Sequence, residues 1–138
     1  MNQLKEILKQ KGLKITPQRL AIYGLLKNSK EHPSAEKIHK NLVTLFPTMS
    51  LATVYKTIDT FKEIGLVQEL NIDKSNFRYD ANTIPHPHII CLNCRKVEDL
   101  DTSILDNIYR NIQDSCGYKI ITHQLYFYGY CPECSKHK

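Results

Sequence analysis

Apolar residues recur at helical spacing through the first 64 positions of the chain. The spacing of Leu4, Ile7 and Leu8 is typical of an amphipathic helix, and three similar patterns follow it. A hydroxyl residue precedes each later pattern and can cap a helix by accepting a backbone N–H; these residues are Thr16, Ser34 and Ser50. The pattern therefore predicts four helices, over residues 4–11, 17–28, 35–46 and 51–64.

The faces of the last two helices and the segment after them complete a first unit. Leu45 extends the apolar face of the third helix, and Thr57 belongs to the mainly outward, polar face of the fourth. Alternating stretches at 66–72 and 77–79 flank turn residues at 73–76, which predicts a hairpin. Helices followed by a hairpin are typical of a winged helix-turn-helix, in which the helix before the wing enters the DNA major groove. The candidate recognition helix is therefore residues 50–64.

A second unit follows a segment without periodicity. Residues 81–87 contain two prolines and are interpreted as a hinge. Strands are predicted at 89–90, 96–100 and 118–130, with a helix from Thr102 or Ser103 to Gly117 that ends with Cys116 in the core. The last strand is rich in aromatic residues that so small a unit cannot bury alone, which predicts a homodimer. The fold class is α+β: a winged-helix domain at 1–80, a hinge at 81–87 and a small α/β dimerisation domain at 88–138.

Composition and charge add a compartment and a partner. The 138 residues include no apolar run near the length of a membrane span, and the amino terminus has no hydrophobic signal region. We therefore expect a cytoplasmic protein that does not enter membranes, in which paired cysteines are metal ligands more often than disulfides. Residues 1–65 carry a net charge of +6 and the remainder −1. A basic first half favours nucleic acid as partner, although ordinary scatter among helix charges explains +6 equally well.

Two C-x-x-C pairs form the strongest chemical signal. Cys91 and Cys94 form one pair, and Cys131 and Cys134 form the other, with 36 residues between the pairs. Four thiolates in two such turns match a closed, tetrahedral structural Zn²⁺ site. The separation predicts that this metal ties the end of the chain to the first pair. A redox pair or ordinary buried cysteines is the alternative.

A second set of candidate ligands contains nitrogen and oxygen. His86 and His88 flank a proline, and alternate residues of an extended segment point the same way. Asp80 precedes the hinge, Asp99 follows the first C-x-x-C pair, and His32 lies in the first half. Three imidazoles and two carboxylates suit Fe(II), Mn(II) or Zn(II). Solvated histidines and helix-capping aspartates are the alternative interpretation of each residue.

The motifs together resemble the ferric uptake regulator family of bacterial metal-dependent repressors along nearly the whole chain. The matching stretches are Thr16-Pro17-Gln18-Arg19, His32-Pro33, the run 50–55, Phe77-Arg78-Tyr79-Asp80, the His86-to-Cys94 run and the closing Cys131–Cys134 pair. Aspartates at 80 and 99, where iron regulators usually carry glutamates, make the chain most similar to the peroxide-stress branch. That resemblance implies a palindromic double-stranded DNA operator and a regulatory Fe(II) or Mn(II) site of His32, Asp80, His86, His88 and Asp99.

The resemblance also implies roles for individual residues. Bound Fe(II) is expected to promote oxidation of His32 or His86 by peroxide, which would release the metal. DNA contacts are expected from the basic and outward-facing residues Lys14, Arg19, Thr53, Tyr55 and Lys56. A metal-uptake repressor of the same family is the alternative function. A zinc-stabilised hydrolytic or redox enzyme is a third hypothesis, disfavoured because four thiolates leave the zinc no open position.

Overall fold

The computed structural model describes residues 2–73 and 76–136. It divides into two compact units, Met1–Thr83 and Ile84–Lys138, which we call unit 1 and unit 2. Within the described chain, none of the helices has the length and apolar character needed to cross a membrane.

Unit 1 begins with four helices whose starts follow from local capping chemistry. The side-chain oxygens of Thr16, Ser34 and Ser50 each accept the backbone N–H three residues ahead, at 3.1–3.2 Å, as predicted. Pro17 occupies the first turn of its helix, where no amide hydrogen is required. The helices are α1 (Asn2–Gln10), α2 (Pro17–Asn28), α3 (Ala35–Leu42) and α4 (Leu51–Glu63).

The apolar faces of these helices form the core of unit 1. Phe61 of α4 is fully buried, and its ring meets that of Tyr23 edge to face with centroids 5.8 Å apart. Two sequence predictions are wrong here. Helix α3 ends at Leu42, so Leu45 lies in a turn and is 71% exposed. Thr57 is buried, because it lies three residues after Val54 and four before Phe61, on the helix face that these apolar residues share.

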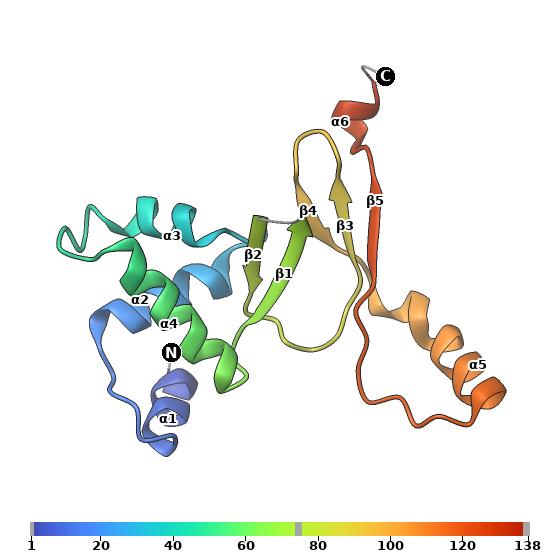
Figure 1. Ribbon diagram of the computed structural model, residues 1–138, viewed down its shortest axis with the longest axis horizontal. Coiled ribbons are helices and arrows are strands. Elements are labelled where there is room, and N and C mark those ends of the chain that lie inside the picture. The colour runs from blue at the N-terminus through green and yellow to red at the C-terminus, as the bar shows by residue number, and fades with distance from the viewer. Residues whose placement is uncertain (1, 74–75, 137–138) are drawn as a thin grey trace. The chain divides into compact units, whose positions relative to one another are not determined.

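A two-stranded ribbon completes unit 1. Strands β1 (Gln68–Asp73) and β2 (Asn76–Asp80) pair antiparallel, with Gln68 opposite Asp80 and Leu70 opposite Arg78. Leu70 and Ile72 are buried. Part of the predicted turn, at 74–75, lies outside the described residues. Helices followed by this ribbon confirm the predicted winged helix-turn-helix, with α4 in the position of the recognition helix (Figure 1).

Unit 2 is built on a three-stranded sheet. Strand β3 (His88–Cys91) lies between β4 (Val97–Asp99) and β5 (Tyr126–Gly129) (Figure 1). β4 pairs antiparallel with β3 and β5 pairs parallel with it. In this register His88 stands opposite both Asp99 and Tyr126.

The rest of unit 2 corrects three predictions. Asp101, not Thr102 or Ser103, caps a short 3-10 helix, η1 (Thr102–Leu105), through the Ser103 N–H at 3.0 Å. Helix α5 (Asp106–Cys116) follows, and Cys116 is exposed rather than in the core. Of the predicted strand 118–130, only β5 forms a strand, because only these residues pair with β3. The chain ends with α6 (Pro132–Ser135).

Candidate metal centres

The four paired cysteines meet in unit 2. One sulfur from each of Cys91, Cys94, Cys131 and Cys134 lies within 4.8 Å of the others, and the Cys94 and Cys131 sulfurs are 3.8 Å apart. Cys91 ends β3 and Cys94 lies in the turn that follows, while Cys131 precedes α6 and Cys134 lies within it. Hydrogen bonds from Cys91 N to Lys96 O (2.9 Å) and from Leu92 N to Gly129 O (2.8 Å) hold the turn to its own hairpin and to β5. The sheet therefore places the two pairs together.

Several N–H groups point at these sulfurs. The Cys91 sulfur accepts the backbone N–H of Cys131 at 3.4 Å and that of Cys94 at 3.5 Å. The Asn93 side-chain amide donates to the Cys134 sulfur at 3.2 Å. Donors of this kind stabilise negative charge on sulfur. The cluster is therefore arranged for thiolates.

The pKa values of two of these thiols shift in opposite directions. Backbone N–H groups, first that of Cys131 and then that of Cys94, lower the pKa of Cys91 to about 6. The Cys134 N–H lowers the pKa of Cys131, but desolvation and hydrogen bonds to neighbouring side chains raise it by more, to about 12. The protein alone thus favours one thiolate and opposes the next. A divalent cation removes that conflict, since coordinated thiols are deprotonated.

A second cluster in unit 2 contains two imidazoles and a carboxylate. His86 Nε2 lies 3.0 Å and His88 Nε2 lies 3.2 Å from the same oxygen, Asp99 Oδ1. The strand register places Asp99 opposite His88, and the two imidazole centroids are 4.3 Å apart. The prediction that alternate residues bring His86 and His88 to one side is confirmed.

The hydrogen bonds of His86 indicate which of its ring nitrogens is available to a cation. Its Nδ1 lies 2.6 Å from the Ile84 carbonyl oxygen, which requires Nδ1 to donate. In the neutral ring Nε2 then holds a lone pair that faces a carboxylate oxygen. A proton or a metal ion can lie between them, and the Ile84 carbonyl oxygen orients the ring in the way that hydrogen-bond partners orient metal-ligating histidines.

Unit 1 contains a matching pair. His32 Nδ1 and Asp80 Oδ2 lie 3.7 Å apart, and both side chains are buried. His32 precedes α3 with a φ of 53°, a left-handed conformation that costs roughly 1–2 kcal/mol for a residue with a Cβ. Such strain persists where surrounding contacts hold it. Like the cluster in unit 2, this pair offers nitrogen and oxygen without sulfur.

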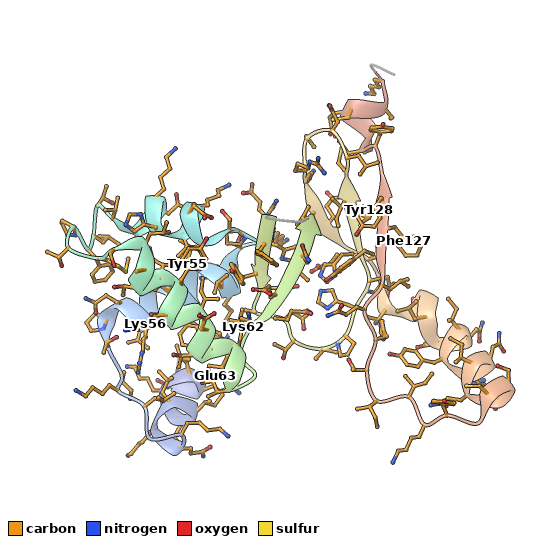
Figure 2. The ribbon with its side chains drawn as sticks, viewed as in Figure 1. Tyr55, Lys56, Lys62, Glu63, Phe127 and Tyr128 are labelled. Carbon is orange, nitrogen blue, oxygen red and sulfur yellow. The ribbon has the colours of Figure 1, made fainter. Side chains whose placement is uncertain are left out.

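The predicted DNA-contact residues lie on two parts of unit 1. Thr53, Tyr55 and Lys56 are exposed on α4, where Figure 2 labels Tyr55 and Lys56. Lys14 is exposed before α2, and its carbonyl oxygen accepts a hydrogen bond of 2.7 Å from the Arg19 guanidinium. α4 thus offers hydroxyl, aromatic and cationic groups to solvent on one short helix.

Three supporting residues escaped the sequence analysis. Arg78 donates to the backbone carbonyl oxygens of Glu31 and His32, and burial lowers the pKa of its guanidinium. Glu36 accepts a 2.5 Å hydrogen bond from the Tyr55 hydroxyl, which lowers the pKa of Glu36 and raises that of Tyr55. Asn93 is the third, as a donor to sulfur. Each acts across elements distant in sequence, so no local spacing signals it.

Comparison with known proteins supports the family resemblance. The ferric uptake regulator family model matches residues 10–128. The transcriptional regulator PerR of Clostridium acetobutylicum is 51% identical over 134 residues, which cover 97% of each chain. The peroxide operon regulator of Bacillus subtilis is 43% identical and covers 99% of this chain and 94% of its own.

Solved structures agree. The ferric uptake regulator of Helicobacter pylori, described with three functional metal-binding sites, superposes with a TM-score of 0.86 at 27% identity, over 97% of this chain and 90% of its own. The Campylobacter jejuni peroxide stress regulator gives a TM-score of 0.76 at 33% identity, over 95% and 98%. Sequence motifs, fold and comparisons converge, and the chain belongs to the ferric uptake regulator family.

Proposed function

We propose that this protein is a dimeric, metal-dependent transcriptional repressor that senses peroxide in the cytoplasm. The observation that carries the proposal is the convergence of His86 Nε2 and His88 Nε2 on one oxygen of Asp99. This arrangement favours a bound cation, and its nitrogen and oxygen ligand atoms suit Fe(II) or Mn(II). The relatives named above as peroxide regulators support peroxide as the signal that this protein senses.

The regulatory metal would be held by His32, Asp80, His86, His88 and Asp99. Two of these ligands belong to unit 1 and three to unit 2. A metal that binds all five therefore selects one orientation of the winged-helix domain (1–80) about the hinge (81–87) relative to the second domain (88–138). In a dimer that orientation sets the separation of the two α4 helices, so metal occupancy becomes affinity for two operator half-sites.

The peroxide response would destroy a ligand. Fe(II), when bound, would activate hydrogen peroxide toward a neighbouring imidazole, which supplies the two electrons. In the net reaction one oxygen atom enters the C2–H bond of an imidazole to give 2-oxo-histidine, and the second leaves as water, a two-electron oxidation balanced by reduction of one peroxide. His32 and His86 are the candidate targets. Loss of one ligand lowers metal affinity and thereby releases DNA.

Two further features complete the proposal. Zn²⁺ in the four-thiolate cluster would hold the second domain permanently. The dimer would form on β5, whose outer edge pairs with no strand of the described chain and which carries Phe127 and Tyr128, 45% and 54% exposed (Figure 2). On DNA, Tyr55 offers an apolar contact for thymine methyl groups, and Thr53 and Lys56 offer base-edge contacts. Lys14 and Arg19 would contact the phosphates of the DNA backbone.

The decisive experiment loads the protein with Fe(II), adds dilute hydrogen peroxide and weighs tryptic peptides. We expect one added oxygen atom on peptide 31–37, which contains His32, or on peptide 79–95, where fragmentation assigns His86. Peptide 38–40 contains His39, whose Nε2 lies 2.9 Å from the Met49 carbonyl oxygen outside both clusters, and serves as the internal control. A parallel sample with Mn(II) should stay unmodified.

A metal-uptake repressor is the second candidate, favoured by the TM-score of 0.86 to the Helicobacter pylori ferric uptake regulator. The same experiment separates the two functions. Unmodified peptides together with unchanged, metal-dependent DNA binding after peroxide would refute peroxide sensing and leave the uptake function standing. DNA binding that ignores Fe(II) and Mn(II) altogether would refute both.

A further inference from the structure

Arg78 joins the ribbon of unit 1 to a loop 46 residues earlier in the chain. From β2 its guanidinium donates through Nε to the His32 carbonyl oxygen and through Nη2 to the Glu31 carbonyl oxygen. One side chain therefore holds two successive peptide groups. The planar fork of arginine has donors spaced for such a pair, whereas the lysine ammonium is a single point.

The loop that Arg78 holds has a conformation that needs support. His32 has a φ of 53°, in the left-handed region that residues with a Cβ rarely adopt. A second contact comes from the next residue of β2, where the Tyr79 N–H donates to the Pro33 carbonyl oxygen at 3.1 Å. The following residue is Asp80. Three consecutive residues of β2 thus fix the backbone around His32 and supply the carboxylate 3.7 Å from its Nδ1.

We propose that Arg78 is a positioning residue for the regulatory metal, acting through the backbone of His32 and touching no metal itself. The inference rests on the proposed function, because it takes His32 as a ligand. Without the guanidinium, the loop relaxes from the left-handed conformation, and the imidazole is no longer presented beside Asp80. Outer contacts that orient a ligand typically change metal affinity 10–100-fold.

The sign of the effect distinguishes positioning from electrostatics. Arg78 carries a positive charge close to a site for a cation, so charge alone predicts that Arg78→Gln binds Mn(II) more tightly. Positioning predicts weaker binding, on the order of 10–100-fold. The control is Arg110→Gln, which removes the same charge from an exposed position of α5. It should bind Mn(II) as the parent does.

Mn(II) affinity is measured by electron paramagnetic resonance of the free ion, on the full-length parent, Arg78→Gln, Arg78→Lys, Arg110→Gln and His32→Ala. Arg78→Lys keeps the charge and offers one donor site, so an intermediate affinity is expected. If Arg78→Gln loses its helical circular dichroism signal, Arg78→Lys carries the comparison. If the Arg78 variant binds Mn(II) as tightly as the parent or more tightly, while His32→Ala binds it more weakly, the positioning role is overturned. The proposed function then remains intact.

A second readout needs no metal. Hydrogen exchange of the apo protein should be faster in residues 29–35 of Arg78→Gln, while residues 51–63 of α4 exchange as in the parent. A uniform increase in exchange rate across unit 1 would mean that the whole unit is less stable, rather than that the loop has lost its hydrogen bonds from Arg78. That result would overturn the inference. If His32→Ala takes up as much Mn(II) as the parent, the ligand role of His32 fails and this inference fails with it; if the parent takes up no Mn(II), the proposed function fails.

Discussion

Replacing Cys134 by serine tests whether the thiolate cluster, rather than a hydrophobic core, holds unit 2. Cys134 lies in α6 with intermediate exposure, and its sulfur accepts an N–H···S bond from Asn93. Substituting oxygen for this one sulfur disturbs little packing. A large loss of structure in Cys134→Ser would therefore come from loss of the metal.

The magnitude follows from what unit 2 buries. Besides Pro87 and Cys91, its buried apolar side chains among the described residues are Ile90, Val97 and Leu105. Full burial of one such side chain stabilises by about 1.5–3 kcal/mol. Zn²⁺ in a site of this type contributes roughly 10–16 kcal/mol, which exceeds the three side chains together. We therefore expect Cys134→Ser to leave unit 2 unfolded.

The assay combines metal analysis with urea unfolding followed by tyrosine near-ultraviolet circular dichroism. Cys134→Ser should retain less zinc and lose the near-ultraviolet signal of the tyrosines of unit 2. Cys116→Ser, an exposed cysteine outside the cluster, is the matched control, expected within about 0.5 kcal/mol of the parent. A Cys134→Ser protein with one tightly bound zinc and the parental urea midpoint would refute the reasoning.

Three other outcomes are expected. His86→Ala should fold with its zinc, because His86 is not in the thiolate cluster, yet show no increase in DNA affinity on addition of Mn(II) in a fluorescence-anisotropy titration; a parental response would contradict its ligand role. Tyr55→Ala should lose about 1–3 kcal/mol of discrimination between a duplex selected with the parent protein and its scrambled version, while Tyr55→Phe keeps most of it; equal behaviour of the two variants would exclude a ring contact. Burial first, then nearby acidic groups, raises the pKa of Tyr79 above the usual 10.0. The unfolded chain then ionises first, so stability falls as pH rises above about 10, and Tyr79→Phe should show a smaller loss of urea midpoint between about pH 9 and about pH 11 than the parent does.

The elements that sequence predicted well are those with local causes. A cap needs one hydroxyl and an amide three residues ahead, so Thr16, Ser34 and Ser50 marked the starts of their helices. The C-x-x-C pairs likewise carry half of a tetrahedral site within four residues. The two pairs complete one site when the end of the chain lies next to the first pair.

The elements that sequence missed depend on partners far along the chain. Alternation over 118–130 predicted a long strand, but a strand exists only where another strand pairs with it, and of these residues only β5 pairs with β3. Arg78 looks like any polar residue of a ribbon until the loop at 31–32 is placed against it. Ligand sets assembled from several elements have the same difficulty, which is why the family resemblance was needed to gather His32 with Asp99.

The two clusters of unit 2 share strand β3. The cluster of His86, His88 and Asp99 therefore depends on the thiolate cluster, but the thiolate cluster does not depend on it. β3 begins at His88 and ends at Cys91, about 10 Å apart at the usual rise per residue. The thiolate cluster fixes the far end of β3 and, through the Leu92–Gly129 and Cys91–Lys96 hydrogen bonds, the register with β5 and β4. That register is what places Asp99 opposite His88. Loss of the structural metal should therefore abolish the regulatory site, whereas loss of the regulatory metal should leave β3 and the thiolate cluster in place.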